Sequence, residues 1–132
     1  LAECQELRHT RYADGLPTGE AVITTAGNMP ARHVIHTVGP VFSAAGVQAA
    51  DLLSACYRNS LSLAVQHNLS TIAFPAISTG VYGYPREEAA AVASQSIADF
   101  LATDSSLNQV FRVRLVFFAA QDAAVFLTHQ TF

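Results

Sequence analysis

Apolar residues recur along much of the chain at the three- and four-residue spacing of a helix face. The clearest run covers 48–67, and a second extends from 85 to about 102. Shorter amphipathic segments at the two ends, 1–12 and 122–130, are also expected to be helical. The pattern therefore predicts two long helices between two short ones.

Strand-like segments lie between these helices. The segments 20–28 and 32–40 are rich in β-branched residues and are separated by a short turn, which is typical of an antiparallel pair. Segment 70–77 is a nearly continuous apolar run, as expected of a strand covered on both faces in a parallel sheet. A last strand is expected from Val110 onward.

Helix ends can be assigned from single residues. Asn68 is a plausible stop for the first long helix, and Pro85 fits the first position of the second. Glu87 and Glu88 would then lie in the first turn, where the helix dipole favours negative charge. Asp122 is expected to cap the last helix.

The order of elements is helix, strand, strand, helix, strand, helix, strand, helix. Such alternation indicates a layered α/β fold with a mixed sheet. At 132 residues, 51% of them apolar, the chain has the length and composition of one domain, 1–132.

Charge and cysteine content exclude some classes of function. The net charge is −3, lysine is absent and the seven basic residues are scattered arginines, so a nucleic-acid partner is not expected. No apolar run has the length of a membrane span. Two isolated cysteines, Cys4 and Cys56, form no disulfide framework, which favours a cytoplasmic location.

The segment "AISTGVYGYP", from Ala76 to Pro85, is the leading candidate site. It joins a buried strand to a helix, which is where ligands bind in open α/β sheets. Gly80 and Gly83 allow close approach of a ligand, and free N–H groups at the helix start favour an anion such as a diphosphate. Tyr82 and Tyr84 offer aromatic faces for a sugar or ring.

The same segment is also compatible with an ordinary turn, because Gly, Ser and Thr are common turn residues. Neither G-x-x-x-x-G-K-[ST] nor G-x-G-x-x-G occurs in the chain, so a P-loop or a Rossmann dinucleotide site is not supported. A nucleotide at this turn would have to bind in another way.

Other reactive residues have simpler interpretations. His33 and His36 form H-x-x-H, but on a strand they fall on opposite faces, so no metal site is expected. Cys56 lies on the apolar face of a predicted helix and is expected to pack in the core, not to act as a nucleophile. Asp14 and Glu20 are interpreted as turn and strand-edge residues.

Several motifs together resemble the macro domain family, in particular its MacroD-type branch. They are "LPTGEAVIT", "MPARHVIHTVGP", "LLSACYRNSLSLA", "IAFPAISTGVYGYPREEAA" and "RVRLVFF", and they cover residues 16–118. The resemblance implies a three-layer α/β/α fold with a central mixed sheet that binds ADP-ribose.

The resemblance also implies roles for individual residues. The loop that holds the diphosphate and distal ribose would comprise Ser78, Thr79, Gly80, Val81, Tyr82 and Gly83. Members of this branch remove mono-ADP-ribose from acidic side chains or deacetylate O-acetyl-ADP-ribose. The expected partner is therefore ADP-ribose or an ADP-ribosylated protein, and no cofactor or metal is expected.

The chain departs from the family pattern in two places. The first strands and the glycine-rich loop that carries a catalytic Asp have no counterpart, so the domain is expected to be N-terminally incomplete and its catalytic residues remain unassigned. Ala119 or Ala120 occupies the place where an aromatic residue often stacks on adenine. Two alternatives stay open, a reader module without turnover and a fragment or dimer whose sheet a partner chain completes.

Overall fold

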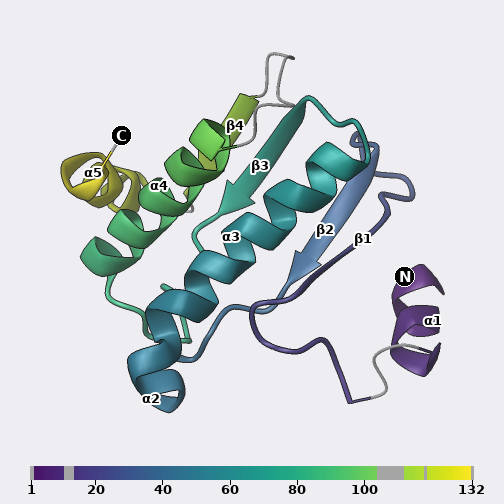
Figure 1. Cartoon of the computed structure of the whole chain (residues 1–132), viewed down its shortest axis with the longest axis horizontal. Helices are drawn as coiled ribbons and strands as arrows, with labels where there is room; N and C mark the ends of the chain where they lie inside the picture. Colours follow the sequence, from purple (N-terminus) through teal and green to yellow (C-terminus); the bar gives the residue numbers. More distant parts are fainter. Residues whose placement is uncertain (1, 11–13, 104–111, 118, 132) are drawn as a thin grey trace.

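A computed structural model of the chain describes residues 2–10, 14–103, 112–117 and 119–131 (Figure 1). Helices and strands follow one another in the predicted order, with a short helix and a 3-10 turn added before the first long helix. The elements are α1 (Ala2–Thr10), β1 (Ala21–Thr25), β2 (His33–Thr37), α2 (Phe42–Ala45), η1 (Gly46–Gln48), α3 (Ala49–Gln66), β3 (Thr71–Pro75), α4 (Arg86–Thr103), β4 (Arg112–Val116) and α5 (Ala120–His129).

The four described strands form two separate pairs. β1 and β2 are antiparallel, with Ala21 opposite Thr37 and Thr25 opposite His33, which confirms the predicted pairing. β3 and β4 are parallel, with Thr71 opposite Arg112. Both kinds of pairing expected of a mixed sheet are present, but they belong to two sheets of two strands each. One continuous central sheet is therefore not formed among the described residues.

β3 differs from its sequence-based prediction in its burial. Its run of apolar residues predicted a strand covered on both faces, but Phe74 is its one buried residue. Phe74 packs under α3, where its ring lies 5.0 Å from that of Tyr57. Thr71, Ala73 and Pro75 alternate with it and are exposed, because the helices cover a single face of this pair.

α3 runs across both strand pairs and connects them (Figure 1). Its apolar face is fully buried at Leu53 and Leu61, where it contributes to the core. The predicted stop is confirmed, since Asn68 adopts a left-handed φ of 55° just after the helix. The main core cluster comprises Ala49, Leu53, Tyr57, Leu61, Phe74, Tyr84, Ala89, Ala90, Ala93, Ile97 and Phe126.

α4 packs beside α3, and α5 packs on α4 (Figure 1). α4 begins at Arg86, one residue later than predicted, and Pro85 accepts the hydrogen bond from Ala89 N–H at 2.9 Å. The prediction that Asp122 caps α5 is wrong. The helix begins at Ala120, and Asp122 lies in its first turn, where its carboxylate pairs with Arg86.

α1 lies against the outer strand β1. The Glu3 carboxylate accepts hydrogen bonds from the backbone N–H and the hydroxyl of Thr25. His36 also lies near α1, with Nε2 2.9 Å from the Thr24 hydroxyl and 3.7 Å from Cys4 Sγ. His36 is therefore a half-buried strand residue with a hydrogen-bond partner. None of the described helices combines the length and apolar character needed to cross a membrane.

Candidate functional site

The predicted site residues form a closed loop, residues 78–84, between the carboxyl end of β3 and the start of α4. Ser78 adopts a left-handed φ of 66°, which turns the chain out of the strand. The Tyr84 N–H donates to the Ser78 carbonyl at 2.9 Å, and the Gly83 N–H donates to the Gly80 carbonyl at 3.0 Å. Gly83 has a φ of 74°, a left-handed conformation that favours glycine at this second bend. These bonds fix the loop from within.

Loop 78–84 leaves a run of backbone donors free. Among the described residues, the N–H groups of Thr79, Gly80, Val81 and Tyr82 have no hydrogen-bond partner. Val81 is fully exposed and Tyr82 is 42% exposed, so solvent reaches this part of the loop. Successive free N–H groups next to a helix N-terminus form a favourable site for an anion. The geometry thus suits a phosphate group.

A second loop, which follows β2, supports the first. The Phe42 N–H donates to the Tyr82 carbonyl at 2.9 Å. Gly39 packs against the base of loop 78–84 so closely that a Cβ there would lie 2.6 Å from Ile77 Cγ2 and closer still to Ser78 Oγ. This role of Gly39 was not predicted from the sequence, although the Gly-Pro pair that ends a predicted strand was an available signal.

Two aromatic contacts hold the loop from below. Tyr57 of α3 is buried and touches the backbone of Ile77, just before the loop, and its burial raises the pKa of its hydroxyl. The ring of Tyr84 lies 4.9 Å from that of Phe42. Tyr84 is 3% exposed, so the prediction that it offers a face to a ligand is wrong. The ring packs inward instead, beneath the loop that it closes.

The two hydroxyl residues at the start of the loop lie in different environments. The Ser78 hydroxyl is buried and has no hydrogen-bond partner among the described residues, so it does not face solvent as a donor. The positive φ of Ser78 directs its side chain toward Gly39. Thr79 is half-buried and lines a cavity beside α4.

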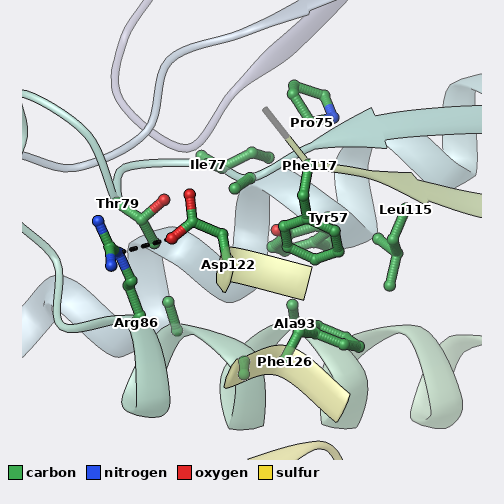
Figure 2. Close-up of a pocket in the computed structure, with 13 residues that line it drawn as sticks. Tyr57, Pro75, Ile77, Thr79, Arg86, Ala93, Leu115, Phe117, Asp122 and Phe126 are labelled. Carbon is green, nitrogen blue, oxygen red and sulfur yellow. Dashed lines mark ion pairs between the residues drawn. The ribbon is translucent and has the colours of Figure 1, made fainter. Parts of the chain in front are cut away.

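This cavity is small and lies between the loop, β4, α4 and α5 (Figure 2). At the mouth of the cavity, Arg86 Nε lies 3.1 Å from Asp122 Oδ1, and this ion pair is close to Thr79. Phe117 lies deeper in the cavity, among apolar side chains. Its volume of about 30 Å³ admits a water molecule but no nucleotide. A nucleotide would therefore have to lie on the outer side of loop 78–84.

The remaining candidates have structural roles. Cys56 is fully buried, its Sγ donates to the Val38 carbonyl at 3.3 Å, and burial raises the pKa of the thiol. Glu87 and Glu88 are exposed in the first turn of α4, as predicted. The described residues contain no group of three His, Cys, Asp or Glu side chains that could hold a metal ion.

The place expected to hold an adenine-stacking residue carries two alanines. Ala119 precedes α5 and Ala120 begins it, and both are exposed. Phe117, two residues before Ala119, packs against Phe126 with the rings 5.4 Å apart. The described part of the chain thus presents no exposed aromatic ring at this position.

Comparison with known proteins gives a consistent set of relatives. A macro domain-containing protein of Streptomyces griseus is 52% identical over 120 residues, which are 91% of this chain and 64% of that protein. An O-acetyl-ADP-ribose deacetylase of Klebsiella pneumoniae is 46% identical over 96% of this chain and 69% of its own length. The chain thus spans about two thirds of the length of these curated relatives.

Solved structures share the fold as well. A variant of the Oceanobacillus iheyensis macrodomain with ADPR superimposes with a TM-score of 0.87 at 43% identity, over 97% of this chain and 67% of that one. The family model of the macro domain matches residues 1–93, most of the chain. The resemblance stated from the sequence motifs is therefore confirmed, and the chain belongs to the macro domain family.

Proposed function

We propose that the protein binds ADP-ribose and that loop 78–84 wraps its diphosphate. The observation that carries this proposal is the run of free N–H groups from Thr79 to Tyr82, at the carboxyl end of β3 and the N-terminus of α4. A diphosphate is the chemical group that such a run of donors suits best. Tyr82, 42% exposed at the edge of the loop, is available to cover the distal ribose.

The relatives support the same ligand. The Oceanobacillus iheyensis macrodomain was solved with ADPR, and a Trypanosoma brucei macrodomain, 35% identical with a TM-score of 0.75, was solved in complex with ADP-ribose. The proposal assigns ligand binding to Ser78, Thr79, Gly80, Val81, Tyr82 and Gly83. In this proposal residues 1–132 act as one domain, and the unpaired thiols of Cys4 and Cys56 fit a reducing, cytoplasmic location.

We further propose that the intact protein is a hydrolase that deacetylates O-acetyl-ADP-ribose or removes mono-ADP-ribose from acidic side chains. The Klebsiella pneumoniae deacetylase supports the first activity. Among the described residues that line the cavity beside the loop, Asp122 is the single carboxylate, and it is held by Arg86, so it is poorly placed to activate a water. We therefore expect these 132 residues to bind ADP-ribose better than they turn over its esters.

Binding is tested by titrating ADP-ribose into the chain in a calorimeter. Gly80 is the site for the test variant, because its φ is not left-handed and a Cβ there would meet no atom within 4 Å. Gly80→Glu should fold normally and place a carboxylate beside the diphosphate. Repulsion of about 1–4 kcal/mol, expected near a protein surface, would weaken binding at least about fivefold.

Gly80→Gln is the matched control, since it has the same size without the charge. The proposal predicts that Gln weakens binding much less than Glu does. Equal affinities for the two variants and the unchanged chain would refute the assignment of the loop. Incubation of the chain with O-acetyl-ADP-ribose, followed by chromatography, separates a hydrolase from a reader, which would bind the compound and leave it intact.

A further inference from the structure

A cysteine and a histidine lie together where α1 meets the pair formed by β1 and β2. Cys4 Sγ on α1 is 3.7 Å from His36 Nε2 on β2, which is within hydrogen-bonding distance for sulfur. Both side chains are half-buried. α1 and α5, which lines the cavity beside loop 78–84, lie at opposite ends of the molecule (Figure 1). The Cys4–His36 pair is therefore separate from the proposed ADP-ribose loop.

Thr24 determines which nitrogen of the His36 ring carries a proton. The Thr24 hydroxyl donates to the Thr25 carbonyl at 3.1 Å, and a hydroxyl has one proton to donate. The Thr24 oxygen, 2.9 Å from His36 Nε2, must therefore accept a hydrogen bond from that nitrogen. Thr24 is 5% exposed, so water competes little for this contact. His36 thus presents Nε2 to the Cys4 sulfur as an N–H donor.

An N–H donor beside a cysteine suits one kind of chemistry. The thiolate is the form of cysteine that attacks electrophiles, and an N–H donates a stronger hydrogen bond to a negative sulfur than to a neutral thiol. Activated cysteines are commonly held by an imidazole that a third group orients. Here the same nitrogen contacts both Thr24 and Cys4, so His36 is placed to hold a thiolate and not to remove the thiol proton.

α1 is the element that covers this sulfur, and it is held mainly by polar contacts. None of its described side chains is buried, and none of its described residues belongs to the main core cluster. The Thr25 backbone N–H donates to the Glu3 carboxylate at 3.1 Å, and the Thr25 hydroxyl donates to the same group. Few apolar contacts oppose a movement of α1 away from β1, so a small molecule can reach Cys4.

We propose that Cys4 is a site of reversible modification by small disulfides, and that His36 is the positioning residue that holds its thiolate. The thiol proton passes to water, and the Cys4 thiolate attacks one sulfur of the disulfide. A new S–S bond forms to Cys4, the original S–S bond breaks, and the other half leaves as a thiolate that takes a proton from water. Cys4 is oxidised to a mixed disulfide and the leaving half is reduced.

The modification also has a structural consequence. The His36 ring already lies against the sulfur and Thr24 lies against the ring, so a group added to Cys4 Sγ has no room between α1 and the strands. We expect the mixed disulfide to displace α1 from β1 and to break the hydrogen bonds between Thr25 and Glu3. A second thiol reverses the exchange and restores these contacts.

Cys56 is the matched control within the same chain. It is fully buried, and its Sγ donates to the Val38 carbonyl at 3.3 Å, with no imidazole among its described hydrogen-bond partners. A disulfide reagent reaches Cys56 only when α3 moves or the chain unfolds. The two cysteines should therefore differ in opposite directions from their behaviour in the unfolded chain.

The test is the rate of reaction with hydroxyethyl disulfide, a small neutral disulfide, at neutral pH. Samples are quenched with acid, and peptide mass spectrometry gives the extent of modification of each cysteine. Cys4 should react faster in the native chain than in the urea-unfolded chain, although it is half-buried when folded. Cys56 should react much more slowly in the native chain than in the unfolded one.

Two variants at His36 separate the effect of the N–H donor from that of exposure. His36→Phe removes the donor and keeps a ring of similar size, and it should slow the native reaction of Cys4 about four- to fifteenfold. This range is the effect of one hydrogen bond to a charged group, reduced because a stabilised thiolate is a weaker nucleophile. His36→Gln keeps an N–H donor and should recover part of the rate, which a merely structural role of His36 would not predict.

Amide exchange at Thr25, followed by NMR, reports whether α1 is docked. The Thr25 N–H donates to Glu3, so its exchange should be slow in the unmodified chain and in His36→Phe, and fast in the mixed disulfide. Slow exchange in His36→Phe shows that a lower rate at Cys4 is not caused by loss of the fold.

Three results would overturn the proposal. The first is that Cys4 reacts more slowly in the native chain than in the unfolded chain, and the second is that His36→Phe reacts as fast as the unchanged chain. The third is that Thr25 exchange stays slow in the mixed disulfide, which would refute the displacement of α1. None of these measurements involves ADP-ribose, so failure here would leave the proposed function standing.

Discussion

Replacement of Gly39 by alanine tests how closely the two loops pack. The new methyl group would lie 2.6 Å from Ile77 Cγ2 and closer to Ser78 Oγ, so these atoms must shift. Overpacking of this kind costs about 1–3 kcal/mol. At about 4 °C per kcal/mol for a chain of this length, the melting temperature should fall by about 4–12 °C. Gly39 itself has no left-handed φ, so the loss would report the contact and not backbone strain.

The assay is thermal and urea unfolding followed by circular dichroism, with Gly80→Ala as the matched control. That control adds the same methyl group where no atom lies within 4 Å. A second variant, Ser78→Gly, removes the hydroxyl that the methyl meets and suits the φ of 66° at this position. The double variant should recover part of the loss, with a coupling of at least about 0.5 kcal/mol. The reasoning fails if Gly39→Ala and Gly80→Ala unfold at the same temperature.

Cys4 should react with iodoacetamide faster than Cys56, because Cys56 is fully buried and that burial raises the pKa of its thiol. Peptide mass spectrometry gives the two labelling rates, and faster labelling of Cys56 would contradict the packing. The pKa of Glu3 is lowered, chiefly by the hydrogen bond from the Thr25 hydroxyl, so this contact stabilises the fold above the ordinary carboxyl pKa and is lost as the pH falls through the lowered value. Urea midpoints between about pH 5 and pH 3 should therefore fall less in Glu3→Gln than in the unchanged chain, whereas parallel profiles would exclude the contact. Leu61→Ala should cost about 2–5 kcal/mol in the same urea assay, since Leu61 is fully buried, and a loss below 1 kcal/mol would show a looser core.

The helices and the hairpin could be predicted from the sequence because their signals are local. The apolar face of α3 and the stop at Asn68 are set by residues a few positions apart, and both agree with the structure. The strand pair around the turn at Gly27 is equally local. The loop that begins at Ser78 was also predicted, because its position between a strand and a helix can be read from the sequence.

Other features depend on residues far apart in the sequence, and these features were either not predicted or predicted wrongly. Gly39 and Ser78 meet only when β2 and β3 both lie on α3. Asp is a common residue type at helix N-caps, but the carboxylate of Asp122 in α5 pairs with Arg86 of α4 instead of capping its own helix. The burial of β3 was overestimated because an apolar run shows that a strand can be covered, and it does not show what covers it.

The position of α3 between the two strand pairs determines which parts of the molecule can unfold locally. Both strand pairs contact this helix, and among the described residues no hydrogen bond links one pair to the other. Each pair can therefore detach as a separate cooperative unit while the helix stays folded against its remaining neighbours. Spontaneous fluctuations of the native state should then proceed in two independent steps, and the amides of α3 should be the last to exchange with solvent.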